Sequence, residues 1–247
     1  MWLPRWVGEL YINIHMNFGG EVFHFEDALK FSKSRSAAKV ALAKLKGMGC
    51  LYVHKRYNRR RGYRLCDPEV LIHVLSGKVT NLWRFKQGRY CRLIGLASVE
   101  ILRKVSDVRS IVVYGSVARG AAGETSDVDM LVIMEGAESL GERLNKLLKL
   151  ETSGKVKEEL DWLYKNGIDT HISFLPLNTE EARFFPPILL DVIHEGIPVF
   201  DDGFYASLVR EKMEVLSKLK ARRIFISEDE WFWDLKPDIK LGDVVEI

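Results

Sequence analysis

The stretch YGSVARGAAGETSDVDMLVI, residues 114–133, decides how the second half of this chain folds. It opens with a Gly-Ser step, Gly115 and Ser116, and closes with Asp127 and Asp129 inside an otherwise apolar run. A bare carboxylate beside a buried strand is costly unless it is paired or holds a cation. The two aspartates therefore indicate a site with its own chemistry rather than ordinary surface.

Two β-branched runs flank the centre of this stretch and predict strands over residues 110–114 and 128–134. The Gly-Ser step and a short helix lie between them. Gly115 then ends the first strand, where the missing Cβ lets another group approach the backbone. Ser116 begins the short helix, and the free N–H groups of a helix N-terminus bind phosphate.

Asp127 and Asp129 are two residues apart, so in an extended segment both side chains project from the same face. Leu131 and Ile133 continue that face into the core, whereas the apolar residues between them pack on the other face. Two carboxylates this close repel each other unless a cation lies between them. Mg²⁺ accepts one or two carboxylates and takes its other ligands from water and phosphate oxygens. The spacing therefore predicts a metal and a nucleotide together.

A Gly-Ser pair, ten further residues and an Asp-x-Asp resemble the signature of the DNA polymerase beta-type nucleotidyltransferase superfamily, particularly its minimal nucleotidyltransferase branch. Tyr114, the Arg119-Gly120 step and Ser126 also resemble that branch, whose pattern is GSxARGxxxxxSDxD. The resemblance covers residues 91 to about 202. It implies a mixed sheet flanked by helices.

The resemblance also implies a reaction in which an NMP passes from an NTP to a hydroxyl-bearing acceptor. The acceptor stays open: it is a protein, an RNA end or a small molecule. Arg119 would brace the triphosphate, and the alternative is a solvated arginine on a short helix. The residues implied for nucleotide binding are Gly115, Ser116, Arg119 and Ser126, and those implied for two Mg²⁺ ions are Asp127 and Asp129.

The superfamily adds a third carboxylate on a later strand, where it helps to activate the attacking hydroxyl. Gly167 precedes the run IDTHISFLPL, in which Asp169, His171 and Ser173 share one face. The usual pattern, an Asp followed directly by apolar residues, would place His171 at the key position. If Asp169 takes the role the carboxylate is present, and if His171 takes it a weakly basic group replaces the carboxylate. Asp169 is therefore the third candidate catalytic residue.

The net charge of +3 conceals two halves of opposite character. Residues 1–90 carry 17 Lys and Arg against 6 Asp and Glu, a balance of +11. Residues 91–247 carry 20 against 28, a balance of −8. Such a split predicts a basic module that meets a polyanion, joined to an acidic module with a different role.

The basic half resembles a winged helix-turn-helix by the order of its predicted elements. A short strand over residues 21–25 leads into a helix from Asp27, and a second helix over residues 35–48 is capped by Ser34. A hairpin follows, with a run of three arginines in its turn. The resemblance implies that the second helix enters the major groove of duplex DNA while the hairpin tip touches phosphates or the minor groove. The residues implied in nucleic-acid binding are Arg35, Lys39, Arg59, Arg60 and Arg61. The alternative is a winged helix used only for packing or dimerisation, so a homodimer stays open.

The sequence thus predicts an α/β (α+β) protein of three parts. Residues 1–85 form the winged helix-turn-helix, residues 86–202 the nucleotidyltransferase domain, and residues 203–247 a C-terminal helix and an aromatic tail. The tail cluster of Trp231, Phe232 and Trp233 is expected to pack against a domain, with base stacking or a subunit contact as the alternative. The three cysteines form no CxxC pair, so neither a zinc site nor a disulfide framework is predicted: Cys50, Cys66 and Cys91.

No apolar run approaches the roughly 20 residues of a membrane span, and the N-terminus lacks the pattern of a signal peptide, so we expect a cytoplasmic protein. Two functions fit the residues. The first is a Mg²⁺-dependent nucleotidyltransferase with a DNA-binding module. The second is a DNA-binding transcriptional regulator, or an antitoxin-like protein, whose nucleotidyltransferase fold binds nucleotide without turnover. The third carboxylate separates the two hypotheses.

Overall fold

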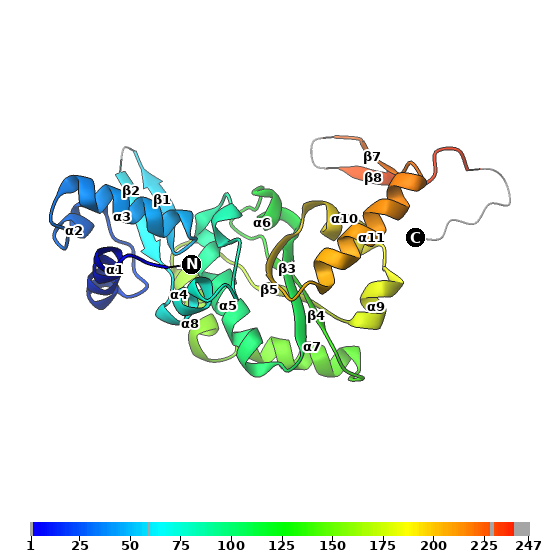
Figure 1. The fold of residues 1–247 in the computed structure, drawn as a ribbon, viewed down its shortest axis with the longest axis horizontal. Coiled ribbons are helices and arrows are strands. Elements are labelled where there is room, and N and C mark those ends of the chain that lie inside the picture. Colours follow the sequence, from blue (N-terminus) through cyan, green and yellow to red (C-terminus); the bar gives the residue numbers. More distant parts are fainter. Residues whose placement is uncertain (1, 59, 228–229, 240–247) are drawn as a thin grey trace.

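The computed structural model describes residues 2–58, 60–227 and 230–239. The N-terminal part lies at one end of an elongated molecule, a four-stranded sheet occupies the middle, and a helix with a two-stranded hairpin lies at the other end (Figure 1). No described helix is both long enough and apolar enough to cross a membrane.

The elements follow the chain in three groups. The N-terminal group is α1 (Arg5–Phe18), α2 (Phe25–Leu29), α3 (Arg35–Gly47), β1 (Leu51–Tyr57), β2 (Arg60–Leu65) and α4 (Pro68–Leu75). The central group is η1 (Leu82–Arg84), η2 (Gly88–Tyr90), α5 (Cys91–Lys104), β3 (Val108–Tyr114), α6 (Gly115–Arg119), β4 (Val128–Met134), α7 (Leu140–Leu148), η3 (Lys149–Glu151), α8 (Gly154–Lys165), β5 (Ile172–Asn178), α9 (Thr179–Phe184), α10 (Ile188–Glu195) and β6 (Ile197–Asp201). The last group is α11 (Phe204–Lys218), β7 (Arg222–Phe225) and β8 (Trp231–Asp234).

Helix α3 begins where the sequence predicts, because the Ser34 hydroxyl accepts a hydrogen bond from the Ala37 N–H at 3.1 Å. Its apolar face is buried in the N-terminal core. The short strand predicted before α2 is reduced to a single bridge between Phe23 and Tyr63. The helix predicted from Asp27 starts two residues earlier, and this leaves little chain for a strand.

The hairpin β1–β2 is tighter than predicted. Tyr57 pairs with Arg60, so Arg60 and Arg61 lie in strand β2 rather than in the turn. Asn58 adopts a left-handed conformation with φ of 52°, which short hairpin turns require. Two arginines of the predicted tip are therefore fixed by strand pairing.

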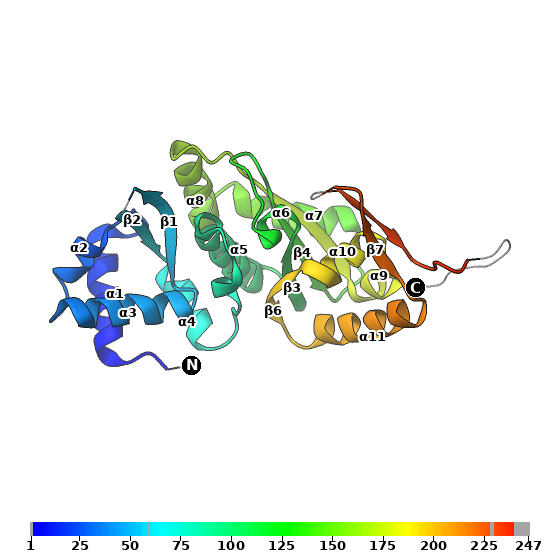
Figure 2. The same cartoon turned by 90° about the horizontal axis from the view of Figure 1, so that it is seen from above.

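The central sheet is mixed and has the strand order β5-β4-β3-β6. Strand β4 runs parallel to β5, whereas β3 runs antiparallel to β4 and β6. Alternate residues of β3 and β4 enter two different cores, one on each face. Helix α5 packs on the face toward the N-terminal part, and α10 and α11 pack on the other (Figure 2). The mixed sheet flanked by helices agrees with the predicted α/β class.

The apolar core continues across the predicted boundary between residues 85 and 86. One buried cluster contains Leu45 of α3, Tyr90 beside α5 and Ile111 of β3. Arg64 of β2 pairs with Glu159 of α8 through both carboxylate oxygens, at 2.6 and 2.8 Å, and each side chain is 3% exposed. The N-terminal and central parts thus share a core and a buried ion pair. The three cysteines are buried and free, as small core residues are.

The C-terminal aromatic cluster forms a strand that the sequence did not predict. Helix α11 ends at Lys218, and Lys220 then takes a left-handed conformation with φ of 58° as the chain turns back. Strand β8 then pairs with β7, and both Trp231 and Trp233 donate from Nε1 to Oδ1 of Asp191 on α10, each at 3.0 Å. Two of the three aromatic side chains are therefore used in packing.

Candidate functional site

The site forms where β3 ends beside β4. Tyr114 is in register with Asp129, so the residue after Tyr114 lies against the aspartate side chain. That residue is Gly115, with φ of +68°, and a Cβ built on it would lie 2.2 Å from Oδ2 of Asp129. Only glycine can adopt this conformation without strain and leave room for the carboxylate. Gly115 and Asp127 are 12 residues apart in sequence. The fold brings the Gly-Ser step and the Asp-x-Asp together at one site.

The two aspartates project from one face of β4, as their spacing predicts. Leu131 and Ile133, on the same face, enter the core beneath α10 and α11, whereas Val128, Met130 and Val132 enter the other core. Asp127 lies at the open end of the strand and is exposed. Its Oδ1 accepts a hydrogen bond from the His171 backbone N–H at 3.2 Å.

Asp129 lies deeper, and its environment raises the pKa of its carboxyl group. Burial is the main cause, and the negative charge of Asp127 adds to it. A hydrogen bond from the Ser173 hydroxyl and the positive charge of Arg119 oppose the rise of this pKa. Because the pKa of Asp129 is raised overall, Ser173 and Arg119 do not compensate for the burial of this carboxylate and the charge of Asp127.

This carboxylate pair fits an oxygen-preferring cation. In the part of the chain that the structure describes, no group of three or more His, Cys, Asp or Glu side chains is placed to hold a metal ion. A Mg²⁺ held by Asp127 and Asp129 would therefore complete its shell with water and phosphate oxygens, which is how Mg²⁺ usually binds beside nucleotides. The backbone of Gly115 leaves space directly at Oδ2 of Asp129.

Helix α6 follows the glycine and is five residues long. Ser116 is half-buried in its first turn, and its carbonyl oxygen accepts the Ala121 N–H at 2.9 Å. Arg119 is partly buried, and its guanidinium has partners within the chain. It forms an ion pair with Glu195 of α10 at 2.5 Å and lies over the Trp231 ring, 5.1 Å from its centroid.

The loop between α6 and β4 is held from both sides. Ser126 shapes it locally, because its hydroxyl accepts the Gly123 N–H at 2.8 Å. Gln87 binds the Ala122 backbone through two hydrogen bonds, one from Nε2 to the carbonyl at 2.8 Å and one from the N–H to Oε1 at 3.1 Å. Arg89 donates to the same Ala122 carbonyl at 2.7 Å. The segment before α5 thus fixes the loop that carries the first aspartate.

The third predicted carboxylate lies outside the strand. Strand β5 begins at Ile172, so Asp169 and His171 precede it, and Ser173 is the residue in register with Asp129. The alternation of the run is as predicted, since Asp169, His171 and Ser173 are exposed while Ile172 is buried. Asp169 donates its backbone N–H to the Glu124 carbonyl at 2.8 Å, at the edge of the site.

A different carboxylate, Glu151 of η3, lies near the site. Its Oε1 accepts the Ile172 N–H at 2.6 Å, and its pKa is raised by burial. The charge of His171 lowers this pKa and that of Asp127 raises it, so both residues lie within electrostatic reach. No motif or spacing in the sequence connects Glu151 with Asp127, which explains why sequence reasoning missed it.

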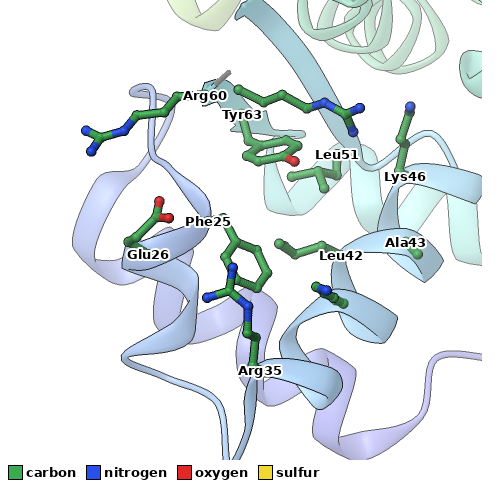
Figure 3. Close-up of a pocket in the computed structure, with 11 residues that line it drawn as sticks. Phe25, Glu26, Arg35, Leu42, Ala43, Lys46, Leu51, Arg60 and Tyr63 are labelled. Atoms are coloured by element: carbon green, nitrogen blue, oxygen red, sulfur yellow. The ribbon is translucent and has the colours of Figure 1, made fainter. Parts of the chain in front are cut away.

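Four of the five residues predicted to bind nucleic acid lie together in the N-terminal part. Arg35, Lys39, Arg60 and Arg61 line a groove of about 500 Å³ between α3 and the hairpin, whereas Arg59 lies outside the described residues. Figure 3 shows the Arg35 side chain against the Phe25 ring, where its guanidinium carbon lies 5.0 Å from the ring centroid. Lys46 of α3 and Arg60 of β2 come to the same groove from its two sides (Figure 3). This groove is called the α3 groove below.

Parts of this chain are similar to known proteins. The "Putative protein adenylyltransferase MJ1305" of Methanocaldococcus jannaschii is 27% identical to this chain over 127 residues, which are 51% of this chain and 80% of that protein. A crystal structure of a toxin-antitoxin with AMP-PNP is 14% identical with a TM-score of 0.33, over 50% of this chain and 90% of that chain. The tri-AMPylated Shewanella oneidensis HEPN toxin in complex with MNT antitoxin matches with a TM-score of 0.30 at 13% identity, over 52% of this chain and 92% of that chain. Residues 98–184, which contain α6, both aspartates and β5, match the family model described as the nucleotidyltransferase domain.

Proposed function

We propose that this protein is a Mg²⁺-dependent nucleotidyltransferase that moves AMP from ATP to a hydroxyl group of a protein. The observation that carries the proposal is the contact between the Gly115 backbone and the Asp129 carboxylate, with Asp127 two residues before it. A phosphate and a metal can share one site there. The match of residues 98–184 to the nucleotidyltransferase domain supports the same reaction class.

In this proposal the side chains hold and orient the reactants. Asp127 and Asp129 would bind the metal, which supplies polarisation of the α-phosphate and neutralises the departing pyrophosphate. Ser116 and the first N–H groups of α6 would contact the terminal phosphates. Arg119 would reach the triphosphate only by leaving Glu195, so it would exchange one anionic partner for another.

The acceptor oxygen would bond to the α-phosphorus while the bond between the α-phosphorus and the bridging oxygen of pyrophosphate breaks. Its hydroxyl proton needs an acceptor, and Asp169 stays our candidate because it is an exposed carboxylate at the edge of the site. We propose a protein as the acceptor and ATP as the donor because the relative from Methanocaldococcus jannaschii is named a putative protein adenylyltransferase.

Labelled nucleotides test this proposal directly. The protein would be incubated with each of the four α-³²P NTPs and Mg²⁺, alone and with lysate of the source cells, and the labelled species digested with protease or with ribonuclease. We expect label from ATP on a protease-sensitive acceptor, and no label after addition of EDTA. The variant Asp127→Ala, Asp129→Ala should label nothing, while the matched variant Asp161→Ala, Glu214→Ala, which removes two exposed carboxylates elsewhere, should label as the parent does.

A second candidate function is a regulator that binds nucleotide without turnover. The observation that favours it is the identity of the residue in register with Asp129, which is Ser173 and not a carboxylate. Nucleotide binding that depends on Asp127 and Asp129, measured by calorimetry, together with no transferred label under any condition would support this function. It would also contradict the transfer proposal.

For the N-terminal part we propose a winged helix-turn-helix that binds duplex DNA. Helix α3 would enter the major groove and the hairpin β1–β2 would contact the backbone. The support is the α3 groove, which Arg35, Lys39 and three further cations line against a single carboxylate, Glu26. Phosphate contacts make binding salt-dependent, so Lys39→Ala with Arg60→Ala should lower the slope of log K against log salt by about 2 in magnitude. The exposed Lys78, outside this groove, provides the control Lys78→Ala.

A further inference from the structure

A second groove runs along the opposite side of β1. It has a volume of about 370 Å³ and lies between β1 and the segment that contains η1 and η2. Gly88 permits the close packing that forms its floor, because a Cβ there would lie 2.7 Å from the Val53 carbonyl oxygen. Trp83 lines the groove and is 61% exposed. This groove is called the β1 groove.

The charge of the β1 groove has one sign. Its lining contains five cationic side chains and no aspartate or glutamate: Lys46, Lys55, Arg56, Lys86 and Arg89. Neither Arg56 nor Lys86 forms an ion pair with a carboxylate in the part of the chain that the structure describes. Unneutralised cations beside an exposed aromatic ring suit a chain of phosphates with bases that can stack.

The two grooves adjoin each other. Lys46 and Leu51 line both of them, so the boundary between the grooves is the junction of α3 with β1. The α3 groove has five cations and the β1 groove has five, and Lys46 is counted in each, which gives nine different cations. Glu26 is the single carboxylate in the two linings.

The far end of the β1 groove meets the candidate nucleotidyltransferase site. Lys86 donates from Nζ to the Arg119 carbonyl at 3.3 Å, and its side chain packs on Gly120, where a Cβ would lie 2.8 Å from Cδ of Lys86. Arg89 donates to the carbonyl oxygens of Ala122 and Gly123. The cations that close the groove therefore also hold the loop between α6 and Asp127.

We propose that the β1 groove is a second nucleic-acid contact, in which the sugar-phosphate strand that leaves the α3 groove continues along β1 to the loop after α6. This inference rests on the proposed nucleic-acid binding by α3 and the hairpin. The strand belongs either to the duplex itself or to a single-stranded extension of it. In both cases its phosphates lie against Lys46, Arg56 and Lys86.

Salt-dependent binding separates this inference from the proposal on which it rests. The probes are a 20-base-pair duplex, the same duplex with a 10-nucleotide single-stranded 3′ extension, and a 20-nucleotide single strand, each in 50 to 200 mM salt. We expect Arg56→Ala with Lys86→Ala to lower the magnitude of the salt slope by about 2, and Lys39→Ala with Arg60→Ala to do so separately. An effect on the blunt duplex assigns the strand to the duplex, and an effect seen only with the extension assigns it to the single strand.

Lysine acetylation followed by mass spectrometry gives a second readout on the unaltered protein. The nucleic acid should protect Lys46 and Lys86 from acetylation and leave Lys78 and Lys218 reactive. If nothing binds, the proposed DNA-binding function fails and this inference fails with it. If binding depends on Lys39 and Arg60 while Arg56→Ala with Lys86→Ala leaves the slope unchanged and Lys86 stays reactive, only the second contact is overturned.

Discussion

Gly115 and Asp129 lie so close that no residue larger than glycine fits at position 115: a Cβ on Gly115 would lie 2.2 Å from Oδ2 of Asp129. The contact joins the end of β3 to the middle of the site and leaves the carboxylate facing a bare stretch of backbone. The absence of a Cβ at Gly115 therefore leaves the space that the Asp129 carboxylate occupies.

We expect Gly115→Ala to lose nucleotide binding and at least about 2 kcal/mol of stability, since the side chain adds both a positive-φ penalty and overpacking. Gly77→Ala is the matched control, because Gly77 has a similar φ of +79° with nothing within 4 Å of its Cβ position. Chemical denaturation and calorimetric ATP titration measure the two effects. Equal stability losses in both variants would show that the carboxylate imposes no steric restriction.

Asp129→Asn should stabilise the metal-free protein at neutral pH while it abolishes Mg²⁺-ATP binding. Because burial raises the pKa of Asp129, the folded chain binds more protons than the unfolded chain between the ordinary and the raised pKa. Stability then falls as pH rises through that window, and the variant escapes this loss. Its advantage, measured as the free energy of unfolding from pH 3 to 8, should vanish below the ordinary carboxyl pKa of about 3.9.

Glu142→Gln should show the opposite pH dependence of stability and serves as the comparison. Hydrogen bonds from the Ser139 hydroxyl and N–H lower the pKa of Glu142, so its contribution to stability is present above the ordinary pKa and is lost as pH falls. This variant should be less stable than the parent at neutral pH. An Asp129→Asn curve with the same pH trend as the Glu142→Gln curve would contradict the environment described for the site.

Glu159→Ala should destabilise the protein by about 3–5 kcal/mol, because it leaves the buried Arg64 without its carboxylate. Arg92, which donates from Nε to Glu159 at 3.0 Å, loses the same partner. Glu158→Ala, at the exposed neighbouring position, should change the free energy of unfolding by less than about 0.5 kcal/mol. Urea denaturation followed by fluorescence compares them, and a cost below about 1 kcal/mol for Glu159→Ala would argue against a buried pair.

Asp191→Ala should release the β7–β8 hairpin from α10. The carboxylate accepts hydrogen bonds from Trp231, Trp233 and Arg223, the last at 2.9 Å. Its removal leaves the two indole donors unpaired and leaves Arg223 with Glu195 as its remaining carboxylate partner. Amide exchange in residues 222–225 and 231–234 should become at least tenfold faster. Asp191→Asn keeps one acceptor oxygen and should keep most of the protection, so equal exchange in both variants would contradict this role.

Acidification should destabilise the protein through His54. Burial, followed by the charges of Arg64, Lys55 and Arg89, lowers the pKa of His54 to about 4. The unfolded chain binds this proton near pH 6.5 and the folded chain does not, so stability falls as pH drops from 6.5 toward 4. His54→Gln should reduce the slope of the unfolding free energy against pH by an amount that corresponds to up to about one bound proton. An unchanged slope between pH 4 and 6.5 would place the acid sensitivity elsewhere, for example at His15, whose pKa is also lowered by burial.

Local signals made several elements predictable. Strand β4 matches its predicted range. Helix α4 begins at a local signal, with Pro68 at its first position and Asp67 as a cap that accepts the Glu69 N–H at 3.0 Å. In such cases the residues that begin and end the element are neighbours in sequence. The hairpin of β7 and β8 could not be predicted in this way, because Asp191, which binds it, lies 40 residues before Trp231.

The pairing of Arg119 with Glu195 shows the same limit for the site. The sequence leaves two alternatives for Arg119, a phosphate contact and a solvated side chain. The structure places beside it a carboxylate from 76 residues away. Glu151 lies near Asp127 because the chain after α7 passes beside the start of β5, where Glu151 accepts the Ile172 N–H. Neither neighbour leaves a local trace in the sequence.

The sequence by itself determined that Gly115, Asp127 and Asp129 belong to one site, because a strand alternates its faces every two residues and a glycine is needed where backbone meets side chain. The tertiary structure decided which residue stands beside them. The start of β5 at Ile172 sets its register against β4 and puts Ser173 opposite Asp129, with Asp169 before the strand. This register depends on where the chain enters β5 after α7 and α8. A shift of one residue would exchange the two faces of β5.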